Sequence, residues 1–94
     1  MKAYYLLMVN ISKPYDTEAL KEKINLALDW VQIVPGVFIV ESTSDLEKWY
    51  GRLKPILKDN DFFLIKITLD GYTGWLHQWV WDWIKEKQDK NGKH

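Results

Sequence analysis

A polar amide ends the first apolar run of the chain. The run over residues 4–9 is followed by Asn10, and Asp16 lies six residues further on. An oxygen ligand at such a corner could contact a hard cation such as Mg²⁺ or Mn²⁺. An Asn in a turn also commonly bonds a neighbouring backbone group. We favour the turn for Asn10, and we expect Asp16 to cap the helix that follows it. A weakened metal or phosphate contact by these two residues is the alternative.

Few other residues could take part in catalysis or metal binding. The chain has two histidines, His77 and His94, and no cysteine. Neither histidine has the spacing of a zinc site, and no Ser or Cys nucleophile pattern accompanies them. We interpret His77 as a surface or boundary residue rather than a general base.

One basic stripe stands out in the second half of the chain. Lys48 and Arg52 are one helical turn apart, and Lys58 follows them. These residues could contact a nucleic-acid backbone, although Asp45 and Glu47 weaken the local positive field. A solvated helix face is the default interpretation of the stripe.

Tryptophans are concentrated between residues 75 and 83. Helical spacing predicts that Trp79 and Trp83 lie in the core, together with Val80, and that Trp81 points to the opposite side. An exposed Trp is typical of interaction hot spots. We therefore expect Trp81 to contact a second subunit or a protein partner, with base stacking as the second interpretation.

The composition limits the class of protein. The 94 residues are 47% hydrophobic and make one domain, expected over residues 1–88 with a disordered tail over 89–94. Thirteen basic residues balance thirteen acidic ones, so the broad positive field of non-specific nucleic-acid binders is missing. The longest apolar run is too short to span a bilayer. We expect a cytoplasmic protein without a membrane partner.

The pattern of apolar residues and turns predicts the order βαββαβ followed by a further helix. The first helix is expected to present Leu20, Ile24, Ala27, Leu28 and Val31 on one face, and the second to open with a capping box of Ser44 and Glu47 and to bend or end near Pro55. The expected elements are strands over 2–11, 31–34, 37–41 and 62–68, and helices from residue 16 or 17, from residue 44, and over about 73–87. This order predicts an α+β, ferredoxin-like fold with a four-stranded antiparallel sheet and both main helices on one face.

Several segments resemble a known family. The sequence is similar to the small CRISPR-associated adaptation protein that dimerises beside the spacer integrase, and more closely to its stand-alone relatives, the SinR-like and VapD-type proteins. The segments that carry the resemblance are residues 12–14 after the first strand, 52–57 with 59–61, 69–71 with 74–76, and 81–84.

The resemblance implies a ferredoxin-like homodimer. In members that are nucleases, one Asp from each subunit holds a divalent metal across the dimer axis, and that Asp corresponds to Asn10 here. With Asn10 at this position, the two subunits would offer a divalent metal two neutral amides instead of two carboxylates, and such a site would bind Mg²⁺ weakly. We therefore expect a non-catalytic homodimeric interaction protein without a cofactor. The alternatives are a divalent-metal-dependent ribonuclease or deoxyribonuclease using Asn10 and Asp16, and a non-cleaving nucleic-acid-binding dimer using Lys48, Arg52 and Lys58.

Overall fold

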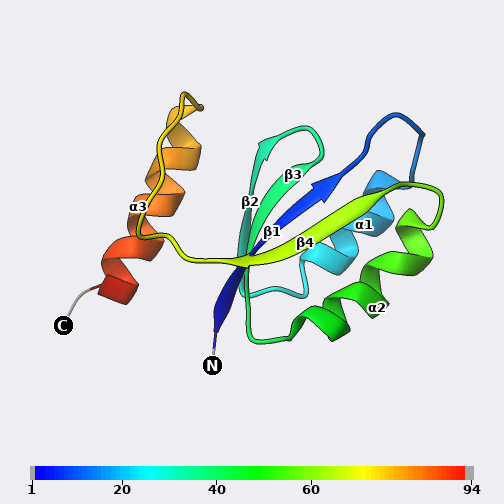
Figure 1. Ribbon diagram of the computed structural model, residues 1–94, viewed down its shortest axis with the longest axis horizontal. Coiled ribbons are helices and arrows are strands. Elements are labelled where there is room, and N and C mark those ends of the chain that lie inside the picture. Colours follow the sequence, from blue (N-terminus) through cyan, green and yellow to red (C-terminus); the bar gives the residue numbers. More distant parts are fainter. Residues whose placement is uncertain (1, 93–94) are drawn as a thin grey trace.

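The chain folds into a four-stranded antiparallel sheet with three helices (Figure 1). The structure is a computed structural model that describes the backbone of residues 2–92 and the side chains of residues 2–89. The elements are β1 (Ala3–Val9), α1 (Thr17–Ile24), β2 (Asp29–Val34), β3 (Val37–Ser42), α2 (Leu46–Leu57), β4 (Phe62–Ile67) and α3 (Gln78–Gly92). The arrangement is ferredoxin-like with an added C-terminal helix, which confirms the predicted fold class.

The strand order places β1 inside the sheet and β2 and β4 at its edges. The order is β2-β3-β1-β4, and every neighbouring pair is antiparallel. On β1, Leu6 lies opposite Ile39 of β3 and Ile65 of β4. Because β1 has a strand on both sides, its apolar residues can be buried on both faces.

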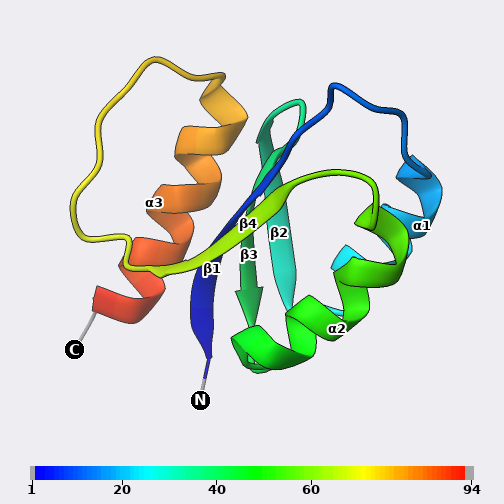
Figure 2. The ribbon, with the colours of Figure 1, turned by 45° about the vertical axis from the view of Figure 1, so that its right-hand side comes forward.

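Helices cover the two faces of the sheet unequally. Helices α1 and α2 lie on one face, and α3 lies alone on the other (Figure 2). The first core, between the sheet and α1 with α2, includes the fully buried Trp49, Leu53 and Ile24. The second core is smaller, and its buried members are Tyr4, Val31, Ile39, Val80 and Ile84.

Aspartates begin the first two helices. The Asp16 side chain accepts a hydrogen bond from the Ala19 backbone N–H at 3.0 Å, as expected for an N-cap. Asp45 accepts from the Lys48 N–H at 2.9 Å and caps α2. The predicted capping box of Ser44 and Glu47 is therefore wrong by one residue.

The end of the first helix differs from the prediction, whereas the end of the second agrees with it. Helix α1 ends at Ile24, so Leu28 lies exposed in the following loop and Val31 belongs to β2. Helix α2 ends at Leu57, with Pro55 in its last turn, as predicted.

The last helix begins later and continues further than its sequence pattern predicts. Residues 73–77 form no helix, and α3 runs from Gln78 to Gly92 rather than over about 73–87. The tail predicted to be disordered over residues 89–94 is therefore helical up to Gly92. Residues 93–94 lie outside the described part of the chain. Within residues 2–92, none of the helices has the length and apolar character needed to cross a membrane.

The hairpin between β2 and β3 turns at Pro35 and Gly36. Gly36 has a φ of 83°, a conformation that L side chains rarely adopt. Its carbonyl accepts a hydrogen bond from the Val9 N–H at 2.7 Å, which ties the hairpin to the end of β1. A Cβ at this position would lie 2.7 Å from the Val9 carbonyl oxygen. The turn therefore requires glycine for both its conformation and its space.

Candidate interaction surface

Local hydrogen bonds occupy the corner that holds Asn10. Its Oδ1 accepts from the Ser12 N–H at 3.0 Å, and its own N–H donates to the Asp61 carbonyl at 2.8 Å. Asn60 Nδ2 donates to the carbonyls of Asn10 and Lys13, both at 2.8 Å. The Asn10 side chain therefore stabilises the turn after β1, and its backbone N–H ties this turn to the residue before β4.

Asp16 and Asn10 are each engaged in separate local contacts. The Asp16 carboxylate caps α1, while the Asn10 amide bonds its own loop. Among the described residues, no three His, Cys, Asp or Glu side chains are grouped so that they could hold a metal ion. The observed geometry fits the structural interpretation of both residues.

The basic stripe is broken by the position of Arg52. Its guanidinium carbon lies 4.7 Å from the centre of the buried Trp49 ring, a cation–π contact. Lys48 and Lys58 are exposed, and Lys58 is the C-terminal cap of α2. The structure thus leaves two of the three predicted basic residues on an open helix surface.

Two tryptophans of α3, Trp79 and Trp81, have the opposite exposure to the one predicted, whereas Trp83 packs on the core as predicted. Trp79 is 57% exposed and is not part of the core. Trp81 is partly buried, packs on the second core and stacks on Tyr72 with ring centres 5.8 Å apart. Trp83 is also partly buried and meets the Tyr4 ring edge-on at 6.3 Å. The reason for assigning Trp81 a partner contact was its expected exposure, which the structure reverses.

An ion cluster centred on the buried Lys87 and Glu41 sets the orientation of α3 on the sheet. Lys87 Nζ lies 3.1 Å from Glu41 Oε1 and 2.8 Å from Asp29 Oδ2, and only 6% of Lys87 is exposed. Tyr4 Oη donates to Glu41 Oε2 at 2.9 Å, and Lys2 Nζ lies 3.2 Å from the same oxygen. This cluster buries Lys87 one turn after Ile84, which fixes the face of α3 that meets the sheet.

The cluster shifts the pKa values of its members. Burial alone would raise the pKa of Glu41, but the hydrogen bonds from Lys87, Tyr4 and Lys2 outweigh it, so the pKa of Glu41 lies below its ordinary value. Burial is likewise outweighed at Asp29, whose pKa is lowered by Lys87 and the Trp30 N–H. At Lys87 the two carboxylates outweigh burial and raise the pKa. All three groups are therefore held in their charged forms.

An apolar surface surrounds the edge strand β4. On the α3 side of the sheet, Phe63, Ile65 and their neighbour Met8 are exposed, because α3 covers only the opposite end of that face. On the other side, Leu46 and Tyr50 of α2 are exposed beside the strand. We call these five residues, with the edge of β4 between them, the β4 surface.

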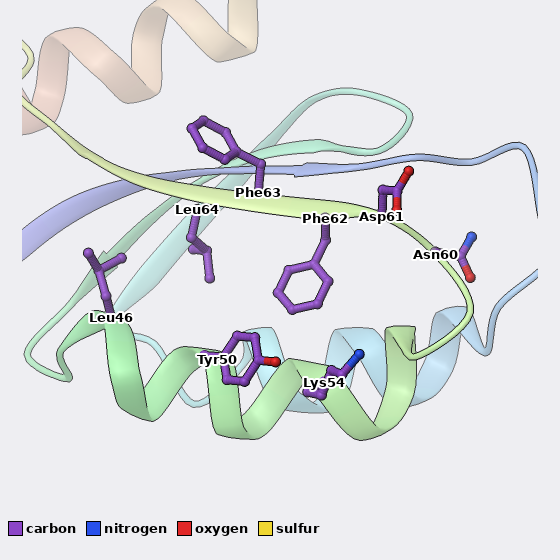
Figure 3. Close-up of a pocket in the computed structure, with 8 residues that line it drawn as sticks. All are labelled: Leu46, Tyr50, Lys54, Asn60, Asp61, Phe62, Phe63 and Leu64. Carbon is purple, nitrogen blue, oxygen red and sulfur yellow. The ribbon is translucent and has the colours of Figure 1, made fainter.

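The two sides of the β4 surface meet at a depression of about 400 Å³. Phe62 and Leu64 point from β4 toward α2, whereas Phe63 points to the other face of the sheet (Figure 3). The Phe62 ring stacks on Tyr50, with ring centres 5.9 Å apart. Lys54, Asn60 and Asp61 supply the polar rim. Apolar side chains thus flank both sides of a strand edge that no other described strand pairs with, as in protein–protein contact surfaces.

The sequence interpretation did not include the β4 surface among the candidate sites. Its signal was present in residues 62–65, Phe-Phe-Leu-Ile, which are apolar at every position. Such a strand needs cover on both faces. Within the described residues, Phe63 and Ile65 stay exposed on one face, and β4 is also an edge strand of the sheet.

No protein-family model, no curated protein and no solved structure matches this chain.

Proposed function

We propose that the protein is a non-catalytic homodimeric interaction protein whose two copies pair through the β4 surface. The observation that carries this proposal is the exposure of apolar side chains on both sides of an open strand edge. The resemblance to the small CRISPR-associated adaptation proteins also implies a homodimer. The non-catalytic part is supported by Asn10 and Asp16, whose side chains are engaged in a turn and a helix cap.

The direction of the main-chain groups favours a definite pairing. The Asn10 N–H donates to the Asp61 carbonyl, so Asp61 faces β1. Residues facing toward and away from a neighbour alternate along an antiparallel strand. Phe62, Leu64 and Lys66 therefore direct their backbone groups outward, where a second β4 can bond them.

A two-fold axis at Leu64 uses this edge symmetrically. Two antiparallel copies of β4 centred there place Phe63 of each copy opposite Ile65 of the other, on the α3 side of the sheet. On the opposite side, the α2 helices approach each other with Leu46 and Tyr50 between them. Such an isologous contact buries the whole β4 surface and leaves neither copy with an open β4 edge.

A pair of charge variants tests this geometry. Size-exclusion chromatography with light scattering should give the wild type about twice the 11.2 kDa chain mass. Phe63→Glu and Ile65→Lys should each give monomers, because each substitution buries two unpaired charges in the dimer. Both side chains are exposed in one chain, so both variants should keep the wild-type circular dichroism spectrum.

Mixing the two variants supplies the decisive readout. In the mixed dimer, the introduced carboxylate lies opposite the introduced ammonium group, and the other contact is the native pair of Ile65 with Phe63. Mixing should therefore restore dimers that neither variant forms alone. Leu28→Lys is the matched control, because Leu28 is equally exposed but lies in the loop after α1. A monomeric wild type, or no dimer in the mixture, contradicts the pairing, and cleavage of RNA or DNA by the wild type with Mg²⁺ or Mn²⁺ contradicts the non-catalytic function.

A further inference from the structure

A second groove runs along the other edge strand of the sheet, β2. It has a volume of about 520 Å³ and is lined by residues 30–35 together with His77 and Trp79. Successive side chains of a strand point to opposite faces. A groove that touches every residue from Trp30 to Val34 therefore reaches the main chain of β2 and not only one of its faces.

The main chain of β2 has hydrogen-bonding groups that face this groove. Among the described residues, β2 has β3 as its one neighbour in the sheet. The Trp30 N–H donates to Asp29 Oδ1 at 2.8 Å, and it thus points away from β3. Because directions alternate along the strand, the Gln32 N–H also points outward. The Trp30 N–H is already bonded to the Asp29 side chain, and the pairing with β3 shifts its register between Gln32 and Val34. The main chain of Gln32 therefore supplies the outward groups that an added extended strand could bond.

Two stacked aromatic rings form the wall of the groove on the α3 side. The rings of His77 and Trp79 are 4.2 Å apart and inclined by only 6°. Trp79 keeps 57% of its surface exposed, so the rings offer apolar area to a ligand. The eight lining residues include no Asp, Glu, Lys or Arg.

We propose that this groove binds an extended, uncharged peptide segment of a partner protein, which adds a strand to β2. The outward main-chain groups of Gln32 would bond the peptide backbone, and the ring pair would receive one of the peptide's apolar side chains. The lack of basic lining residues disfavours a nucleic acid, whose phosphates need cations. The inference deepens the proposed function by naming the class of partner, and it rests on the protein acting through contacts.

The β2 groove is independent of the proposed pairing through β4. Two copies joined at β4 would form one sheet with a β2 strand at each outer end. Each dimer would therefore carry two identical, separate peptide sites. A monomeric variant should still carry one.

The test uses an array of short capped peptides without charged residues, in which apolar and polar residues alternate. Fluorescent wild-type protein should bind a subset of this array, and N-methylation of alternate peptide nitrogens should remove the binding. Gln32→Pro deletes the outward N–H at an edge position that tolerates proline, and it should weaken binding about tenfold. Gln32→Val is its matched control, because it keeps the N–H and should bind like the wild type. Trp79→Ala should also weaken binding.

The results separate the two proposals. Peptide binding by monomeric Phe63→Glu supports the β2 groove even if the β4 pairing fails. The groove proposal is overturned if no array member binds the wild type, or if folded Gln32→Pro binds as well as Gln32→Val. It is also overturned if Gln32→Pro, but not Gln32→Val, halves the mass of the wild-type assembly, because a second copy would then occupy the groove.

Discussion

At the scale of single residues, Gly36 connects the β2–β3 hairpin to the end of β1. Gly36→Ala should destabilise the protein by about 2 kcal/mol, because an L side chain is strained at its positive φ and the added Cβ meets the Val9 carbonyl. Chemical denaturation at equilibrium measures this change in the free energy of unfolding.

Gly51 provides the control for Gly36. It lies in α2, and within the described residues a Cβ built there has no atom within 4 Å apart from its chain neighbours and the backbone of its own helix. Gly51→Ala should stabilise the protein by up to about 1 kcal/mol, because alanine is the better helix former. Equal effects of the two substitutions would show that the contact between Gly36 and Val9 contributes little to stability.

At the scale of elements, the ion cluster of Lys87, Glu41 and Asp29 holds α3 on the sheet. Lys87→Met should cost about 3–5 kcal/mol, because it leaves Glu41 buried without its main cation. Glu41→Gln in the same chain removes that charge and keeps an acceptor for the Tyr4 hydroxyl. The double variant should therefore be more stable than Lys87→Met alone, and additive losses in urea denaturation would contradict this coupling.

The same cluster predicts how stability depends on pH. The pKa of Glu41 is below its ordinary value of 4.5, so its contribution is complete above pH 4.5 and is lost as the pH falls through the lower, folded-state value. The pKa of Lys87 is raised above 10.5, so its contribution is lost only in more alkaline solution. The stability difference between the wild type and Lys87→Met should accordingly narrow in acid below pH 4.5, as denaturation at neutral and acid pH would show. A constant difference would indicate that Lys87 acts through packing alone.

The sequence predicted the element order and the sheet but not the orientation of α3. Trp79 and Trp83 lie on one side of the helix and Trp81 lies on the opposite side, so aromatic side chains occur on both sides and do not mark the buried one. The buried face of α3 is marked by Val80, Ile84 and Lys87, which follow one another at spacings of four and three residues. From the sequence alone, Lys87 would be assigned to the surface, because lysines are mostly exposed and its partners Asp29 and Glu41 are distant in the sequence. The burial of Lys87 was therefore not visible before the strands were placed.

Contacts between distant parts of the chain also explain why the end of the first helix was predicted wrongly and why the β4 surface was missed. The apolar spacing from Leu20 to Val31 continues through a loop into β2, so periodicity alone placed the helix end too late. Asn10 and Asp16 could be placed correctly in a turn and a cap, because those contacts are local. The β4 surface depends on which strands are at the edges, and this is a property of the assembled sheet.

At the scale of the whole molecule, the proposed pairing links thermal stability to protein concentration. Unfolding of a dimer releases two chains, so the melting temperature of the wild type should rise as its concentration is increased. The monomeric Ile65→Lys variant should melt at a temperature independent of concentration. Differential scanning calorimetry over a concentration series measures both, and a concentration-independent wild type would contradict the dimer.

The central place of β1 has a consequence for the order in which the protein can fold during synthesis. Within this sheet β1 is synthesised before its two neighbours, and the partners are distant: Val40 follows Tyr5 by 35 residues and Ile67 follows Tyr4 by 63 residues. A nascent chain that ends before Phe62 therefore exposes one side of its most apolar strand. Because distant pairings form slowly, this interval is when the growing chain is most open to aggregation and most dependent on chaperones.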